Sequence, residues 1–216
     1  MANDHKQRFF ALALACGVLR FGDFVLKSGR RSPYFFNAGL FHSGASLASL
    51  GEFYAQAAIA SGITFDLVFG PAYKGIPLAA ATAIGLARAG RDVGYAFNRK
   101  EAKDHGERGV VIGHPLRGHR VLIVDDVISS GLSVAEAVAL IQAEGATGAG
   151  VIIALDRQER GTGTLSAVDE VRRHYGLPVF SVASLEDLLS YLRPQPAHAA
   201  QVHAIETYLS QYGVTG

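Results

Sequence analysis

The chain of 216 residues has one cysteine, no tryptophan and no excess of charge of either sign. A single cysteine excludes an intrachain disulfide, and because Cys16 lies in an apolar stretch we expect a small core residue rather than a reactive thiol. The 20 Lys and Arg residues nearly balance the 19 Asp and Glu residues, whereas broad nucleic-acid binding needs a strong basic field. No apolar run is long enough to cross a bilayer. Nucleic acid and membrane are therefore not expected partners, and any anion site must be local.

The N-terminal stretch 9–15 is apolar and follows two basic residues, which imitates a secretory signal. The run is short, however, Asp4 lies in its basic part, and Gly17 can end a helix. We therefore predict a buried amphipathic helix over 4–16 and a cytoplasmic protein. Hydrophobic residues make up 49% of the chain, enough to bury a sizeable core.

Short apolar stretches alternate with helical spacing along the rest of the chain. The predicted strands are 24–27, 34–37, 66–69, 93–97, 121–124, 150–155 and 179–182. The predicted helices are 46–60, 76–89, 133–144 and 199–212. The first two strands flank a turn rich in Gly, Ser and Pro and are expected to form a hairpin. The later alternation predicts an α/β fold with a parallel sheet covered on both faces, where ligands bind beyond the carboxyl ends of the strands.

Residues 121–133 carry the clearest chemical pattern. An apolar strand ends in two adjacent carboxylates, Asp125 and Asp126, and a small hydroxyl-rich loop then opens into a helix. Amides of such a loop can hold a phosphate, whereas carboxylates accept hydrogen bonds from sugar hydroxyls or approach a divalent cation. The pattern predicts a ribose 5-phosphate in a cavity, with its diol on the carboxylates and its phosphate on 129–133. The alternative is an ordinary strand end with solvated Asp residues and a helix N-cap at Ser133.

This segment resembles the signature of the type I phosphoribosyltransferases, and other segments resemble the orotate phosphoribosyltransferase family among them. Those segments are the stretch 27–39, the loop 70–77 and the charged stretch 99–109. Taken alone, the loop is a turn and the charged stretch a solvated surface loop. The resemblance implies a Rossmann-like parallel sheet flanked by helices in a single domain, 1–216, with a small N-terminal hood formed mainly by about 18–42.

The resemblance also implies a role for individual side chains. Orotate is expected to contact Lys27, Phe35, Phe36, Ser129 and Arg157. Phosphoribosyl diphosphate is expected to contact Tyr73, Lys74, Arg99, Lys100, Lys103, His105, Asp125, Asp126, Val127, Ile128, Ser129, Ser130, Gly131, Leu132 and Ser133. The expected catalytic residues are Asp125, Asp126, Lys103 and Lys74. The residue types suit the ligands, because orotate is a flat anion that favours an aromatic face and a cation.

The implied reaction joins orotate to 5-phosphoribosyl 1-diphosphate and yields orotidine 5'-phosphate and diphosphate, a step of pyrimidine (UMP) biosynthesis. Its oxocarbenium-like transition state needs no protein nucleophile, and a cationic loop over 99–109 would neutralise the leaving diphosphate and exclude water. Mg²⁺ is the expected cofactor, held through the substrate, with Asp125 and Asp126 as the possible protein ligands. A homodimer that shares the 99–109 loop between subunits is also expected.

The loop after the carboxylates departs from the family pattern, which usually has Thr-Ala-Gly-Thr where this chain has 129–132. Ser129 keeps a hydroxyl and Leu132 loses one, so position 132 is expected to offer its amide alone, and Ser133 can substitute as a hydroxyl donor.

Two other functions stay open at this stage. One is a phosphoribosyltransferase for adenine, xanthine or uracil, although a purine enzyme would not need Lys27 and Arg157 facing a carboxylate. The other is a non-catalytic regulator that senses phosphoribosyl diphosphate, which an extra basic helical domain would favour. No transition-metal site is predicted, because His114 and His119 lack nearby Cys or carboxylate support.

Overall fold

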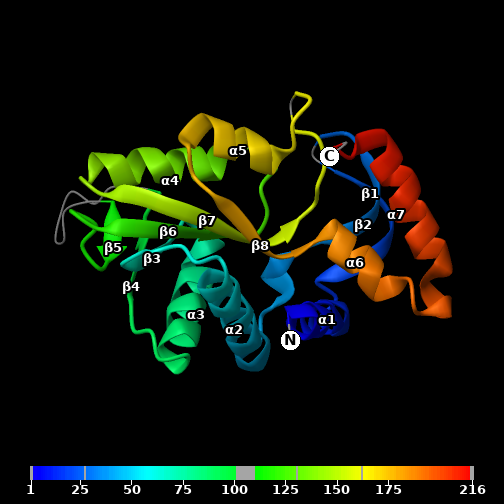
Figure 1. Cartoon of the computed structure of the whole chain (residues 1–216), viewed down its shortest axis with the longest axis horizontal. Helices are drawn as coiled ribbons and strands as arrows, with labels where there is room; N and C mark the ends of the chain where they lie inside the picture. Colours follow the sequence, from blue (N-terminus) through cyan, green and yellow to red (C-terminus); the bar gives the residue numbers. More distant parts are fainter. Residues whose placement is uncertain (1, 27, 101–109, 130, 162, 215–216) are drawn as a thin grey trace.

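The computed structural model describes residues 2–26, 28–100, 110–129, 131–161 and 163–214. Its centre is a six-stranded sheet with the order β5-β4-β3-β6-β7-β8 (Figure 1). The strands are β3 (Leu67–Gly70), β4 (Gly94–Asn98), β5 (Val111–Gly113), β6 (Arg120–Asp125), β7 (Thr147–Asp156) and β8 (Val179–Ser184). Neighbouring strands run parallel except β4 and β5, which confirms the predicted α/β sheet.

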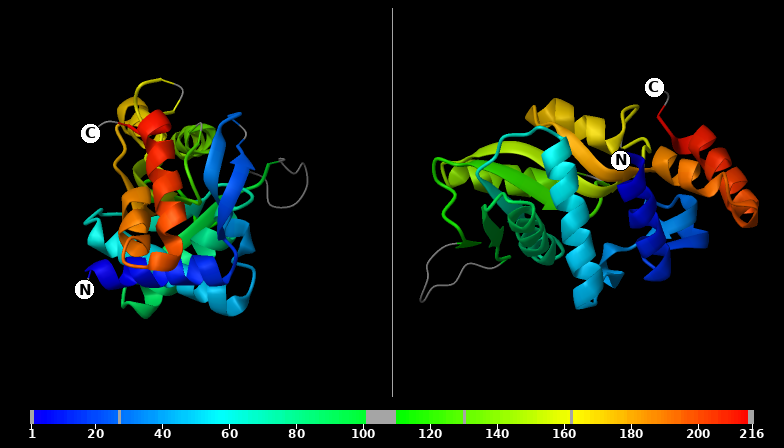
Figure 2. Two further views of the ribbon diagram at one scale, coloured as in Figure 1. Left: turned by 90° about the vertical axis from the view of Figure 1, so that its right-hand side faces the viewer. Right: turned by 60° about the horizontal axis from the view of Figure 1, so that its bottom comes forward.

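Helices cover both faces of this sheet. On one face lie α2 (Gly44–Ala60) and α3 (Gly75–Arg88), and on the other lie α4 (Leu132–Ala143) and α5 (Ala167–Tyr175) (Figures 1 and 2). In β6, Leu122 and Val124 pack in the core on the α2 side, whereas Val121 and Ile123 pack in the core on the α4 side. Successive side chains of a strand point to opposite faces, so burial on both faces requires the continuous apolar run seen in the sequence.

A second, two-stranded antiparallel sheet lies at one end of the molecule. It consists of β1 (Leu19–Val25) and β2 (Arg31–Phe36), followed by a short 3-10 turn, Ala38–Leu40. Helices from both ends of the chain gather here, as Figure 1 shows. They are α1 (Ala2–Ala15), α6 (Leu185–Leu192) and, after a 3-10 turn at Pro196–His198, α7 (Ala199–Tyr212), which packs on β2.

The N-terminal helix is confirmed, because α1 buries Phe9 and Phe10 completely in the core. Cys16 is half-buried at the margin of the same core. None of the helices in the part of the chain that the structure describes is both long and apolar enough to span a membrane.

Among the strands and α-helices that the structure describes, three were not predicted, namely β5, α5 and α6. The strand β5 has only 3 residues, and α5 is so polar that just Ala167, Val168 and Val171 are buried. The helix predicted over 133–144 begins one residue earlier, at Leu132, and its N-cap is Gly131 with a φ of 73°, which excludes the N-cap at Ser133 of the alternative interpretation. Glycine adopts this left-handed conformation without steric penalty, so the chain can turn sharply from the strand into the helix.

Candidate active site

The two carboxylates predicted from the sequence lie at the carboxyl end of β6, and each is only 7% exposed. One Asp125 oxygen accepts a hydrogen bond from the Ser133 hydroxyl at 2.7 Å, and the other accepts one from the Asp126 amide at 2.9 Å. Burial raises the pKa of Asp125, and the Ser133 hydrogen bond partly opposes that rise. The hydroxyl that we expected to be a donor for phosphate is therefore bound to the acidic pair.

The second carboxylate is paired with a lysine from the loop that follows the neighbouring strand. Lys74 follows β3, which lies next to β6, and its Nζ is 2.6 Å from Asp126 Oδ2. The other oxygen of Asp126 accepts a hydrogen bond from the Val127 amide at 2.9 Å. The Lys74 side chain is 59% exposed, so it covers the carboxylate from the solvent side and can leave it without disturbing the core.

The turn after the carboxylates is open to solvent on its outer side. Ser129 and Ser133 are exposed, and Leu132 is 62% exposed at the start of α4. Ile128 is buried in the core on the α4 side of the sheet, and Val127 packs against the core on the α2 side, so neither side chain is free to act as a ligand. Exposed amides at a helix N-terminus suit an anion.

A residue that no sequence pattern indicated supports the backbone of the acidic pair. Tyr54 of α2 is fully buried, and its hydroxyl donates a hydrogen bond to the Asp125 carbonyl oxygen at 2.7 Å. Burial raises the pKa of Tyr54 well above its ordinary value, so the phenol stays a donor. Its place in the helical spacing made it one of several apolar-face residues, and no local signal distinguished it.

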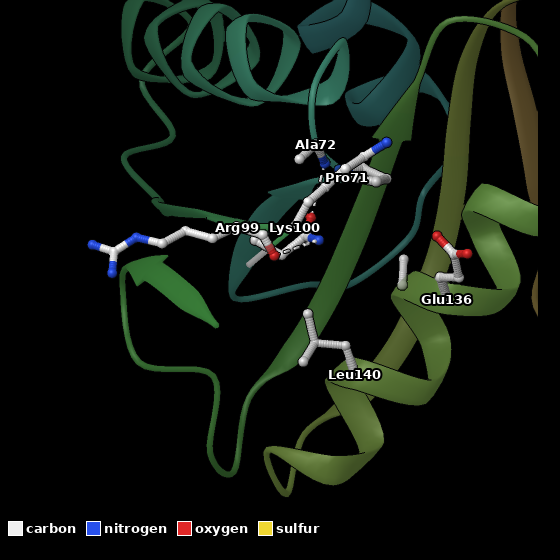
Figure 3. A pocket seen from close by; sticks show the side chains of 8 residues that line it. Pro71, Ala72, Arg99, Lys100, Glu136 and Leu140 are labelled. Atoms are coloured by element: carbon white, nitrogen blue, oxygen red, sulfur yellow. Dashed lines mark hydrogen bonds between the residues drawn. The ribbon is translucent and has the colours of Figure 1, made fainter. Parts of the chain in front are cut away.

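A cavity of about 340 Å³ lies between the loop after β3, the end of β4 and the exposed side of α4 (Figure 3). Its lining residues are Pro71, Ala72, Asn98, Arg99, Lys100, Glu136, Ala137 and Leu140. Asn98 accepts a hydrogen bond from the Ala72 amide at 2.8 Å, which joins the two loops. In Figure 3 the Arg99 side chain points away from α4. The Lys100 ammonium lies 5.1 Å from the centre of the Tyr73 ring, and Tyr73 is 68% exposed.

The expectation that the carboxylates themselves line a cavity is not met here. Neither Asp125 nor Asp126 belongs to the lining of this cavity, nor to that of a second one between the hairpin and α7. The reason is local, because the Ser133 hydroxyl and the Lys74 ammonium already occupy the outer oxygens of the pair. A ligand diol would have to displace these two partners. The carboxylates are therefore covered by groups that a ligand can replace.

Arg157 follows directly after β7, the strand next to β6. Its guanidinium carbon lies 4.5 Å from the centre of the Tyr34 ring, and its Nη2 is 2.6 Å from Glu159 Oε1. Although β7 pairs directly with β6, the arginine extends beyond the strand end, because Asp125 is in register with Ile153. Arg157 thus lies beyond the carboxyl edge of the sheet, against Tyr34 of β2.

Phe35 and Phe36, the two aromatic residues expected to contact orotate, lie on opposite faces of β2. Phe36 is buried in the core beside Phe9, with ring centres 6.2 Å apart. Phe35 is half-buried and stacks on Phe24 at 5.5 Å. Since adjacent strand residues alternate in direction, the two rings cannot both face one flat base.

Several expected site residues lie outside the described part of the chain. They are Lys27, Lys103, His105 and Ser130, together with the rest of the stretch 101–109. Within the described ranges, no group of three or more His, Cys, Asp or Glu side chains is arranged to hold a metal ion. The ring centres of His114 and His119 lie 5.0 Å apart, a contact that was not predicted.

Comparison with known proteins places this fold and site in a class. Residues 40–172, more than half of the chain, match the phosphoribosyl transferase domain family, so the α/β sheet is that of a phosphoribosyltransferase. The chain is 61% identical over 212 residues to the orotate phosphoribosyltransferase of Nitrosococcus oceani, covering 98% of this chain and 96% of the relative. It is also 61% identical over 211 residues to that of Neisseria meningitidis, covering 98% and 99%. The chain belongs to the orotate phosphoribosyltransferase family.

Solved structures agree with this assignment. The crystal structure of orotate phosphoribosyltransferase from Francisella tularensis is 40% identical, with a TM-score of 0.87, and the match covers 95% of this chain and 99% of that one. The Mycobacterium tuberculosis enzyme in complex with 5-phospho-alpha-D-ribosyl 1-diphosphate has a TM-score of 0.63 at 23% identity, covering 84% and 98%, and so shares the fold.

Proposed function

We propose that the chain transfers the 5-phosphoribosyl group from phosphoribosyl diphosphate to orotate, with Asp125 and Asp126 holding the ribose hydroxyls. The observation that carries these roles is the nearly buried acidic pair at the end of β6, directly before an open turn into α4. Carboxylates that accept two hydroxyls would fix the ribose and favour positive charge developing on its ring. The 5-phosphate would then bind the amides of 129–133, with Leu132 contributing its amide and not its side chain.

The diphosphate belongs at the cationic loops beside the pair. Tyr73, Lys74, Arg99 and Lys100 come from the two loops that follow β3 and β4, and Lys103 and His105 of the stretch 99–109 are expected to join them. When a ribose hydroxyl binds Asp126, the Lys74 ammonium is displaced from that carboxylate and becomes available to the leaving diphosphate. Cations positioned where negative charge develops lower the barrier of such a transfer.

Orotate would bind on the other side of the ribose, between Arg157 and the hood. Arg157 offers a cation beyond the carboxyl edge of the sheet, and Phe35 offers a half-buried aromatic ring. Lys27 and the Ser129 hydroxyl are the further proposed contacts. A flat anion is well matched by a guanidinium and an aromatic face.

Mg²⁺ fits this site as a substrate-bound ion. Each oxygen of the acidic pair already accepts one hydrogen bond, from Ser133, Lys74 or a backbone amide, so an ion bound directly would have to share or displace these partners. When bound, the ion would neutralise diphosphate charge through hard oxygen ligands, with Asp125 and Asp126 as its nearest protein carboxylates. We also propose a cytoplasmic homodimer whose subunits share the 99–109 loop.

The direct test follows orotate absorbance in the presence of phosphoribosyl diphosphate and Mg²⁺. Orotate should be consumed, adenine and uracil should give little product in parallel reactions, and omission of Mg²⁺ should greatly reduce turnover. Asp125→Asn and Asp126→Asn should each lower kcat by about 10²-fold or more, because the transition state loses a positioned carboxylate. Turnover of adenine in preference to orotate would contradict the proposed base.

A further inference from the structure

A buried ionic cluster surrounds Arg157. Glu159 Oε1 accepts hydrogen bonds from Arg157 Nε at 2.9 Å and from the Tyr34 hydroxyl at 2.9 Å, and it is 2.6 Å from Arg157 Nη2. The Arg157 and Glu159 side chains are only 15% and 11% exposed. A buried charge pair of this kind is costly to desolvate, so its presence beside a ligand site calls for a functional reason.

The Arg157 guanidinium is held along one edge and over one face. Glu159 contacts the Nε and Nη2 edge, and the Tyr34 ring covers one face at 4.5 Å. The Tyr208 side chain also interacts with the Arg157 guanidinium. Because a guanidinium is planar with donors in a fixed fork, holding one edge and one face sets the direction of the remaining donors.

The loop that carries Glu159 is itself held by distant parts of the chain. Gln158 has a φ of 52°, an uncommon conformation for a residue other than glycine, and its carbonyl accepts a hydrogen bond from the Val214 amide at 3.2 Å. The Arg160 amide donates to the Tyr212 carbonyl oxygen at 2.8 Å, and Arg30 Nη1 donates to the Arg160 carbonyl oxygen at 2.8 Å. The hood and the C-terminal segment, both outside the matched domain 40–172, therefore fix this loop.

We infer that Glu159 is a positioning residue for base recognition, which acts by holding Arg157 in the orientation that binds orotate. This inference rests on the orotate role proposed for Arg157. Glu159 does not need to touch either substrate, because it acts through its contact with Arg157. Tyr34 is the second residue that holds the Arg157 guanidinium in place. The binding of phosphoribosyl diphosphate should not depend on this cluster, because its proposed contacts come from the ends of β3, β4 and β6 and the loops that follow them.

The test measures KM for each substrate and kcat for Arg157→Ala, Glu159→Ala and the double variant. Glu159→Ala should raise the orotate KM about tenfold, because a charged hydrogen-bonded pair is broken, and leave the KM for phosphoribosyl diphosphate within about twofold. Glu159→Gln, which keeps an acceptor, should recover part of the loss. The double variant should be no worse for orotate than Arg157→Ala alone, since a residue that acts through Arg157 has no effect without it. Glu206→Ala is the matched control, because Glu206 also pairs with an arginine, at 3.1 Å, but on the exposed side of α7.

Each other outcome overturns the inference in a recognisable way. An unchanged orotate KM in Arg157→Ala would remove the proposed orotate role of Arg157 and with it the role of Glu159. A raised orotate KM in Arg157→Ala with none in Glu159→Ala would leave the first role and remove the second. Additive losses, or equal losses for both substrates, would indicate a general structural role. If Glu159→Ala does not fold, Tyr34→Phe removes just the hydroxyl that anchors Glu159 and should give a smaller orotate-specific rise; no such rise would equally overturn the inference.

Discussion

At the scale of single residues, the acidic pair is held ready by partners that a substrate can replace. Asp126 is bound to an exposed lysine and Asp125 to an exposed serine hydroxyl, while Tyr54 fixes the backbone behind them. The inner contacts set where the carboxylates lie, and the outer contacts satisfy their charge until a sugar binds. This division explains how nearly buried carboxylates remain usable.

Lys74→Ala should separate these two kinds of contact. We expect kcat to fall by about 10²-fold, because a cation beside the leaving group is lost. The melting temperature should change little, because the Lys74 side chain is 59% exposed and water can take the place of its ammonium at Asp126. Steady-state kinetics and thermal unfolding check the two parts. Arg88→Ala, which breaks another exposed ion pair, with Glu52, serves as the control and should retain full activity. A near-normal kcat for Lys74→Ala would exclude this lysine from the mechanism.

At the scale of elements, close backbone packing positions the loop between β3 and α3. A Cβ added at Gly70 would lie 1.9 Å from the Gly75 carbonyl oxygen, so the strand end and the helix start touch through their backbones. The loop 71–74 between them is thereby held in a tight turn beside Asp126. A glycine at this point is a requirement of tertiary packing, since β3 and α3 must approach within van der Waals contact.

Gly70→Ala should therefore disturb both the fold and the site. We expect a loss of about 1–3 kcal/mol in the free energy of unfolding from overpacking, and a weaker affinity for phosphoribosyl diphosphate. Urea unfolding and substrate kinetics measure the two effects. Gly44→Ala is the matched control, because a Cβ there meets no atom within 4 Å. Equal behaviour of the two variants would contradict the packing argument.

The short helix α6 gives a prediction about acid sensitivity. Asp187 accepts hydrogen bonds from the Ser184 amide and from Lys6 of α1, at 2.8 and 3.0 Å. Partial burial raises the pKa of this carboxyl, but Lys6 and Ser184 outweigh it, so the net pKa lies below the ordinary 3.8. A lowered pKa means stability that is fully present above pH 3.8 and lost as the pH falls through the folded-state value.

Asp187→Ala should accordingly destabilise the protein by about 1 kcal/mol at neutral pH, the usual value of a lost helix cap. The difference from the parent protein should shrink as the pH falls below 3.8, because the carboxyl is then protonated in both states. Thermal unfolding over a pH series measures it. A difference that is independent of pH would mean that the charge of Asp187 plays no part.

At the scale of the whole molecule, N-terminal and C-terminal segments of the chain both contact the loop that follows β7. The hood, α6 and the segment after α7 contact the loop that follows β7, so parts separated by more than a hundred residues build the region proposed to bind the base. The proposed homodimer extends this principle, because each site would also need the 99–109 loop of the other subunit.

Mixing two inactive variants tests that arrangement. Lys103→Ala should lower kcat much more than it weakens substrate binding, and Asp126→Asn should be inactive. If the loop serves the neighbouring subunit, a mixed dimer has one intact site, and an equal mixture should regain about a quarter of full activity. The two variants are unfolded, mixed and refolded together, and the activity of this sample is compared with the activities of the two variants refolded separately. No regain in dimers that have exchanged subunits would assign the loop to its own subunit.

The sequence by itself determined the elements whose information is local. The apolar run of β6, its two terminal carboxylates and the turn into α4 are contiguous, so residues 121–133 predicted strand, acid pair and anion turn together, and the resemblance of this segment gave the family. The helix start was misplaced by one residue, because the Ser133 hydroxyl binds Asp125 and does not cap the helix.

Tertiary structure alone decided the partners. Lys74 contacts Asp126 because β3 and β6 are neighbouring strands. Packing of β2 on the core decides that Phe36 is buried and that Phe35 lies on the opposite face. Glu159 and Tyr34 hold Arg157. Helices α5 and α6 also depend on packing, since their few buried residues give a weak pattern. The physical reason is that a periodic pattern reports how a segment faces the core, whereas the pairing of two distant side chains depends on strand order and register, which no local segment encodes.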